Sequence, residues 1–162
     1  MSRNMPDRPG VLVFPPLIPI GVLILGLGLD RWLPYEVLTR LPHPLRFGIG
    51  GVLICLGGAL ALAGGLTLRH AGTNINPRQP TRNLALRGIY SRTRNPMYLG
   101  GSLALAGLAV LLASDWMLLL LLLALPILHY GVVRREERYL IAKFGEPYRH
   151  YMAVVPRYGW RW

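Results

Sequence analysis

Residues 97–133 read MYLGGSLALAGLAVLLASDWMLLLLLLALPILHYGVV, and Asp115 is the only charged side chain among them. A helix that crosses a membrane needs about 20 apolar residues, so this stretch is long enough for two crossings. A carboxylate in the middle of the membrane is costly, which argues against one continuous helix. We therefore expect Ser114 and Asp115 to form a tight turn between two antiparallel spans, at residues 97–114 and 116–133.

Two further runs without charged residues precede this stretch, at residues 11–29 and 47–68. None of the four runs alternates apolar and polar residues as a membrane strand would. The sequence therefore predicts an all-α fold, an integral membrane bundle of four transmembrane helices within a single domain of residues 1–162. Small residues four apart allow close helix packing, and they occur in the second and third runs at Gly57, Ala61, Gly100 and Ala104.

The first run is interrupted at its start by Pro15, Pro16 and Pro19, so its regular helix is expected to begin near Ile20. A cleaved signal peptide is the alternative interpretation of this run. The run lacks a clear cleavage site of small residues, and three further spans follow it. We therefore treat it as a span.

The chain is 52% hydrophobic and only 15% charged, yet its formal net charge is +11. This apolar content excludes a disordered chain, and so little polar surface argues against binding to nucleic acid. Six Arg lie in the loop at residues 69–96 and seven Lys or Arg in the tail at residues 134–162. The positive-inside rule places both segments and the N-terminus in the cytoplasm, where anionic membrane lipids would be partners.

The sequence contains no familiar metal or nucleophile motif. No His pairs with another His or with Cys55 at the spacing of metal ligands, so we expect no metal site. No glycine-rich phosphate loop precedes a helix.

Two polar segments, residues 87–100 and residues 134–157, are expected at the same membrane face. In the second segment, apolar and aromatic residues recur at near-helical spacing up to a break expected at Pro147: Leu140, Ile141, Phe144, Tyr148 and Tyr151. This pattern predicts an interfacial helix that covers the mouth of the bundle. Such a mouth can hold a polar cofactor from the cytoplasm and admit a lipid from the side.

The string Gly88-x-Tyr90-x-x-x-Arg94-Asn95-Pro96-x-Tyr98-x-Gly100, followed after the hydrophobic stretch by Glu136-Glu137, resembles the isoprenylcysteine carboxyl methyltransferase and phospholipid methyltransferase families. Residues 72–77 (GTNINP) and 144–157 (FGEPYRHYMAVVPR) look similar to bacterial members. The resemblance covers roughly residues 47–158. It implies an enzyme of the bacterial inner membrane that uses S-adenosylmethionine without a Rossmann-type fold. It also implies that the cofactor is held by Gly88, Tyr90, Arg94, Asn95, Pro96, Tyr98, Gly100, Glu136 and Glu137.

The chemistry of this cofactor suggests a role for each charged group. A sulfonium methyl group is already activated, so the protein must align the reacting atoms and exclude water. Glu136 or Glu137 would bind the ammonium group of the cofactor, and Arg94 would bind its carboxylate. Tyr90 and Tyr98 would pack on the adenine or on the sulfonium. The two glutamates can instead pair with neighbouring arginines on a helix surface.

The candidate catalytic residues are Arg134, Arg135 and Glu137. Either arginine can hold a substrate carboxylate, and Glu137 can accept a proton from an amine. Arg157, Tyr148 and Tyr151 are candidates for contact with substrate, although the tyrosines also fit an interfacial aromatic belt. Many family members have His where this chain has Asn95, and Asn cannot titrate near neutral pH, so we expect Asn95 to position the cofactor.

The first candidate acceptor is the carboxylate of an isoprenylcysteine-like compound, and the alternative is the amine of a phospholipid headgroup. Two interpretations from other classes stay open at this point. A sterol-type membrane reductase would bind the phosphates of a nicotinamide cofactor with the arginine-rich loop. A non-enzymatic lipid-binding protein would need neither cofactor.

Overall fold

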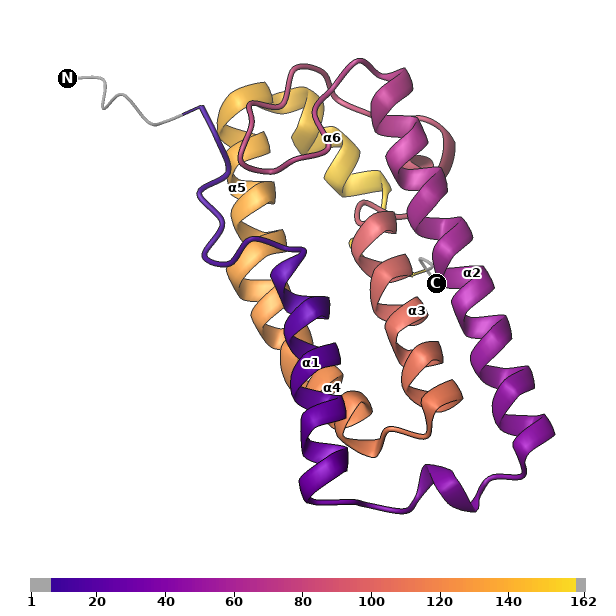
Figure 1. Cartoon of the computed structure of the whole chain (residues 1–162). Coiled ribbons are helices and arrows are strands. Elements are labelled where there is room, and N and C mark those ends of the chain that lie inside the picture. The colour runs from indigo at the N-terminus through magenta and orange to yellow at the C-terminus, as the bar shows by residue number, and fades with distance from the viewer. Residues whose placement is uncertain (1–6, 160–162) are drawn as a thin grey trace.

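The computed structural model describes residues 7–159, and every regular element within them is helical (Figure 1). This confirms the all-α prediction. In chain order the elements are α1 (Leu17–Trp32), η1 (Leu38–Arg40), α2 (His43–His70), η2 (Gly88–Ser91), α3 (Pro96–Leu112), α4 (Asp115–Leu128), η3 (His129–Val133), α5 (Arg134–Phe144) and α6 (Glu146–Val154).

Two helices in the described part of the chain are long and apolar enough to cross a membrane. They are α2 and the continuous helix Asp115–Phe144, which joins α4, η3 and α5. The apolar helix α3 has 17 residues and α1 has 16, so both are shorter. Four membrane crossings therefore stay a prediction.

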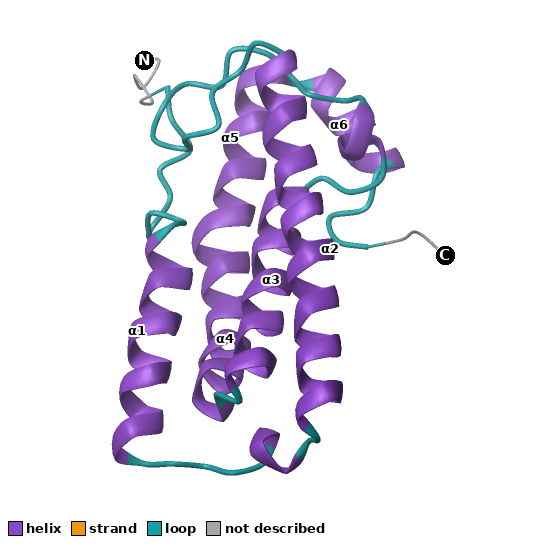
Figure 2. Ribbon diagram, turned by 45° about the vertical axis from the view of Figure 1, so that its right-hand side comes forward, coloured by secondary structure: helices purple, strands orange, loops and turns teal. Residues whose placement is uncertain are grey.

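The four long segments run side by side, with α1 and α2 on opposite sides of α3 and α4 (Figure 2). Helix α2 packs along α3, and α1 packs along α4. The loop between α2 and α3 gathers with α5 and α6 at one end of this bundle (Figure 1). The opposite end holds the connection between α1 and α2 and the turn between α3 and α4.

Helix α1 begins three residues earlier than expected, at Leu17 instead of near Ile20. Pro16 is its N-cap, and Pro19 falls in its first turn. Backbone N–H groups in the first turn of a helix have no intrahelical partner, so a proline there costs no hydrogen bond.

The tight turn expected at Ser114 and Asp115 is confirmed. Ala113 adopts a left-handed conformation with φ of 54°, and the Ser114 hydroxyl accepts a hydrogen bond from the Met117 N–H at 3.1 Å. Asp115 then accepts hydrogen bonds from the backbone N–H groups of Val37 and Leu38, at 2.9 and 3.1 Å. The same turn is thus tied to the connection between α1 and α2.

The expected break at Pro147 is wrong by two residues. The chain turns at Gly145, which has φ of 62°, a backbone conformation that L side chains rarely adopt. Pro147 lies in the first turn of α6, where it is tolerated as it is in α1. The amphipathic segment is therefore two helices, α5 and α6, instead of one interrupted helix.

Helices α2 and α3 meet along a seam of glycines. A Cβ atom on Gly57 would lie 2.5 Å from the Gly100 carbonyl oxygen, and one on Gly100 would lie 2.6 Å from the Ala61 nitrogen. The seam continues with a Cβ of Gly107 at 2.7 Å from the Gly50 carbonyl oxygen. The two backbones are therefore in direct contact, as the small-residue spacing predicts. This contact fixes the start of α3 against α2.

The seam yields a matched test. Gly57→Ala forces a methyl group against the α3 backbone, and overpacking of this kind costs about 1–3 kcal/mol. In a chain of this size about 1 kcal/mol lowers the unfolding temperature by roughly 2–4 °C. Gly58→Ala is the control, because a Cβ there has no heavy atom within 4 Å. Thermal unfolding of both variants in detergent measures the difference, and equal unfolding temperatures would contradict the seam.

Candidate functional site

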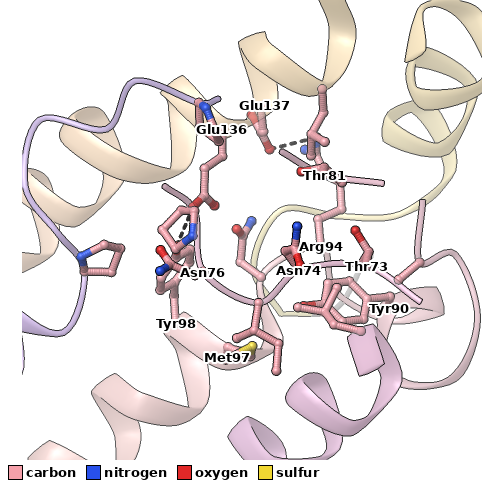
Figure 3. Close-up of a pocket in the computed structure, with 18 of the residues that line it drawn as sticks. Thr73, Asn74, Asn76, Thr81, Tyr90, Arg94, Met97, Tyr98, Glu136 and Glu137 are labelled. Carbon is pink, nitrogen blue, oxygen red and sulfur yellow. Dashed lines mark hydrogen bonds and ion pairs between the residues drawn. The ribbon is translucent and has the colours of Figure 1, made fainter. Parts of the chain in front are cut away.

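A cavity of about 650 Å³ lies at the end of the bundle that carries the loop (Figure 3). Its volume is within the range of about 300–1,000 Å³ that is typical of small-molecule sites. Polar side chains line one part of it: Thr73, Asn74, Asn76, Tyr90, Arg94, Tyr98, Glu136 and Glu137. Apolar side chains line the remainder, including Phe14, Ile18, Leu105, Leu121 and Leu128. The cavity can therefore take a molecule with a charged part beside an apolar one.

The polar wall formed by the loop is shaped by its own side chains. The Thr73 hydroxyl accepts a hydrogen bond from the Arg82 N–H at 3.0 Å, and the Asn74 amide donates to the Pro80 carbonyl at 2.7 Å. The Asn83 amide donates to the Ala71 carbonyl at 2.8 Å. These bonds close the loop on itself and hold it at the cavity without regular secondary structure.

Glu136 faces the cavity from α5 and is bonded to the start of α3. The Tyr98 hydroxyl donates a hydrogen bond of 2.6 Å to its Oε1 atom (Figure 3). No other hydrogen bond or ion pair is found for this carboxylate among the described residues. Glu136 therefore keeps an oxygen for a positively charged ligand.

Glu137, the next residue, is instead engaged by two arginines. Glu137 is 5% exposed, and its Oε2 atom accepts a hydrogen bond from Nη2 of Arg157 at 2.7 Å. Nη1 of Arg94 lies 2.9 Å from the Oε1 atom. A buried carboxylate is stable only when it is paired, and here the two guanidinium groups supply that pairing.

Arg94 nevertheless retains an unused donor. Its side chain is 9% exposed, and its Nε atom has no hydrogen-bond acceptor among the residues that the structure describes. Its Nη1 atom is engaged by the ion pair with Glu137. A buried donor without an acceptor is costly, so this position indicates an acceptor supplied by a ligand, such as a carboxylate.

The tail fixes the segment that carries Arg94. The Arg94 N–H donates to the Pro156 carbonyl at 3.0 Å, and the Asn95 amide donates to the Arg157 carbonyl at 3.2 Å. The Tyr151 hydroxyl donates to the Tyr90 carbonyl at 2.7 Å. In this structure Asn95 thus acts as a donor, a role that needs no titration.

Burial keeps the cavity tyrosines of the loop and of α6 neutral. It raises the pKa of Tyr90, Tyr148 and Tyr151 above the ordinary value of the phenol. The nearby glutamates add to this rise, Glu136 at Tyr90 and Glu137 at Tyr148. All three are therefore hydrogen-bond donors at any physiological pH.

The cavity gathers part of the predicted set. Its lining includes Tyr90, Arg94, Asn95, Tyr98, Glu136, Glu137, Tyr148 and Tyr151. The other predicted residues lie outside the lining: Gly88, Pro96, Gly100, Arg134, Arg135 and Arg157.

These outlying residues have other contacts. Gly100 packs on Gly57, and Arg157 pairs with Glu137. Arg134 lies over the Tyr130 ring at 5.5 Å, and Arg135 donates to the Gly10 carbonyl at 3.1 Å. Both arginines are on α5, where successive side chains point about 100° apart. Arg135, two positions before Glu137, therefore points to the opposite side of the helix, whereas Arg134, three positions before it, lies on the same side but packs on Tyr130.

Sequence reasoning did not place the chain before α1 in the site. Pro9, Phe14, Pro15 and Pro16 line the cavity together with Ile18. No periodic or charge pattern marks these residues, and Pro15 and Pro16 predict only an interruption of the first uncharged run. Met97, at the start of α3, is a further lining residue that motif reasoning passed over.

The comparisons with known proteins gave one match. The sequence model of the phospholipid methyltransferase family matches residues 45–147. The match includes the glycine seam, the loop, Arg94 and both glutamates, and it leaves out α1 and Arg157. No curated protein and no solved structure matches the chain.

The pairing of Glu137 predicts a difference between two glutamates. Glu137→Ala leaves a buried arginine without its partner, and such a loss costs about 3–5 kcal/mol. Glu146→Ala removes a pair of 3.5 Å with Arg149 in which the glutamate is 85% exposed. Pairs of that kind contribute about 0–1 kcal/mol. Glu137→Ala should therefore lower the unfolding temperature in detergent much more than Glu146→Ala does. An equal decrease would show that the pairing of Glu137 does not stabilise the fold.

Proposed function

Because the chain belongs to the phospholipid methyltransferase family, we propose that it transfers a methyl group from S-adenosylmethionine to a lipophilic acceptor. The match indicates a membrane methyltransferase. The observation that carries the finer proposal is the single cavity in which Arg94 and Glu136 lie beside an apolar wall. A charged cofactor and an apolar acceptor need this combination in order to meet.

The polar part of the cavity fits the amino-acid end of this cofactor. The unused Nε donor of Arg94 would bind the carboxylate, and Glu136 would bind the ammonium group. The Tyr90 ring would pack on the adenine or the sulfonium. We assign the ammonium group to Glu136 instead of Glu137, since Glu137 is already paired with Arg94 and Arg157.

The cofactor supplies a methyl group on a sulfonium that is activated for in-line displacement. The chain has to orient the acceptor and keep water out. The buried tyrosines and the apolar wall serve the second purpose. Neither the orientation of the acceptor nor the exclusion of water needs a metal or a covalent bond to the protein.

The number of free carboxylates bears on the acceptor. Glu136 is the one unpaired carboxylate among the described residues that line the cavity. It cannot bind the cofactor ammonium and also accept a proton from an amine. A carboxylate acceptor needs no base, so we propose the carboxylate of an isoprenylcysteine-like compound, with Arg69 of the lining as its cation in place of Arg134 or Arg135.

The amine of a phospholipid headgroup is the alternative acceptor. In that case Glu136 would accept the proton, and another group would have to bind the ammonium of the cofactor. The alternative is favoured by the family description, and it predicts loss of turnover in Glu136→Gln with unchanged cofactor affinity.

We also propose one membrane domain with four crossings in a bacterial inner membrane. The loop at residues 69–96 and the tail from residue 134 would be cytoplasmic, together with the N-terminus. The uneven distribution of arginine supports this orientation. The cavity would then open at the cytoplasmic headgroups, where a soluble cofactor and a lipid can both reach it.

Cofactor binding tests the proposed function directly. Calorimetry on the purified protein should show binding of S-adenosylmethionine and of S-adenosylhomocysteine. Glu136→Gln should weaken S-adenosylmethionine binding by about tenfold or more, because it removes a charged hydrogen-bond acceptor. Glu146→Gln is the exposed control and should leave the affinity unchanged. A wild-type protein that binds neither compound would show the proposal to be wrong, and binding of NADPH alone would point to a reductase.

Methyl transfer identifies the acceptor. The protein in vesicles receives S-adenosylmethionine with a labelled methyl group, together with N-acetyl-S-farnesylcysteine or phosphatidylethanolamine. We expect the label in a methyl ester of the first compound, which is released by mild base. Label in the phospholipid headgroup would instead establish the amine alternative.

Orientation is tested by labelling single cysteines in a Cys55→Ser background. Arg40 and Arg87 are both exposed, and they lie in the first and second loops. A maleimide that cannot cross membranes should label Arg40→Cys on intact spheroplasts and Arg87→Cys only after lysis. The reverse pattern would contradict the orientation.

A further inference from the structure

The chain before α1 forms a strap, residues 7–16, that closes one side of the cavity. This strap and α1 lie outside the family match at residues 45–147. Pro9, Phe14, Pro15 and Pro16 nevertheless belong to the cavity lining, and Ile18 of α1 continues it. The strap is therefore part of the site although it is not part of the matched family region.

Backbone contacts hold the strap against the long helix. The Leu12 N–H donates a hydrogen bond to the Gly131 carbonyl at 3.0 Å, and Nη1 of Arg135 donates to the Gly10 carbonyl at 3.1 Å. Gly131 lies in η3, a π-helical turn. Such turns widen the helix and occur often at functional sites.

Side-chain contacts join the strap to the loop between α2 and α3. The Arg78 guanidinium lies 4.2 Å from the centre of the Phe14 ring. The Tyr139 hydroxyl donates to Asp7 at 2.7 Å and accepts from the Thr81 N–H at 3.1 Å. The strap thus bridges α5 and the loop, and its prolines restrict its backbone further.

The strap supplies Phe14 to the same cavity that is lined by Leu105, Leu121 and Leu128. An acceptor that brings its reacting group to the polar part has to place its adjoining chain beside these residues. Ile18 also faces this part from the first turn of α1. The outer face of α1 exposes further apolar side chains, Ile20, Ile24, Leu25 and Leu27, as on a surface that lipid covers. The apolar part of the cavity thus borders a lipid-like surface.

We propose that the strap and the first turn of α1 select the acceptor, because Phe14 and Ile18 set the width available to the alkyl chain next to its reacting group. This inference rests on the proposed function, and it adds the residues that decide which lipid chain is accepted. A chain with methyl branches needs more of the space that these two side chains take up than an unbranched chain does. Removal of either side chain therefore relaxes the selection.

The first experiment compares two acceptors that differ in width. N-acetylcysteine carries either a straight decyl chain or a branched farnesyl chain on its sulfur, and kcat/KM is measured for both. Phe14→Ala and Ile18→Ala should each shift the ratio toward the farnesyl compound by about tenfold, as expected when a hydrophobic pocket gains room. Leu25→Ala is the control, because Leu25 lies on α1 and is 60% exposed. An unchanged ratio in both variants overturns the inference.

The second experiment does not depend on turnover. A farnesyl-type N-acetylcysteine with a diazirine in its chain is photolysed with the wild-type protein in vesicles that contain S-adenosylhomocysteine, and labelled peptides are mapped. We expect label on residues 9–18 that is suppressed by unlabelled N-acetyl-S-farnesylcysteine. Label confined to the outer residues 20–27 of α1, or insensitive to the competitor, overturns the inference.

The two experiments separate the two proposals. Suppressible label on the strap without any methyl transfer would refute the methyltransferase and leave the strap as a lipid-binding wall. Methyl transfer in which neither Phe14→Ala nor Ile18→Ala changes the ratio of kcat/KM for the two compounds would refute the proposed selection and leave the methyltransferase proposal standing. Binding of S-adenosylhomocysteine to each variant confirms that the variant is folded, and Phe14→Trp should shift the ratio toward the decyl compound.

Discussion

The pairing of one buried carboxylate with two arginines organises the whole site. Glu137 lies on the long helix, Arg94 comes from the segment before α3, and Arg157 comes from the tail after α6. The charges of Glu137 and Arg94 are too costly to bury alone, so the segments that carry them are stable only together. Arg157, which is 32% exposed, ties the tail to the same carboxylate. The pairing also leaves Glu136 to the cavity, because the arginines are engaged by its neighbour. The position of Arg94 in the cavity therefore depends on its contact with Glu137.

Two backbone features give this pairing its geometry. The glycine seam brings α3 against α2, and so it fixes Tyr98 at the height of the cavity. The π-helical turn η3 lies directly before α5, and any change of helix register there rotates Glu136 and Glu137 about the helix axis. The glycine seam sets the distance between α2 and α3, whereas the π-helical turn sets the direction in which Glu136 and Glu137 point. Both act on residues well away from themselves.

The features that follow from apolar length and from turn chemistry were predictable from sequence. Long uncharged runs predicted the helices, and Asp115 predicted the turn, since a charge is unfavourable within a membrane. The positions of Arg134, Arg135 and Glu137 around the helix were not predictable. Adjacent residues differ by about 100° on a helix, and a π turn changes the register without a sequence signal. The strap was missed because some of its contacts use backbone groups, which every sequence possesses, and its side-chain partners, such as Arg78 and Tyr139, lie far away along the chain.

At the end of the bundle away from the cavity, Asp115 accepts two backbone hydrogen bonds from the connection between α1 and α2. That connection and the turn between α3 and α4 are thereby joined at one point. A movement that separates the helices and keeps these bonds is a rotation about that point. Its displacement grows with distance from Asp115 and is greatest at the opposite end. A disturbance of these bonds at Asp115 would therefore have its largest effect on the width of the cavity.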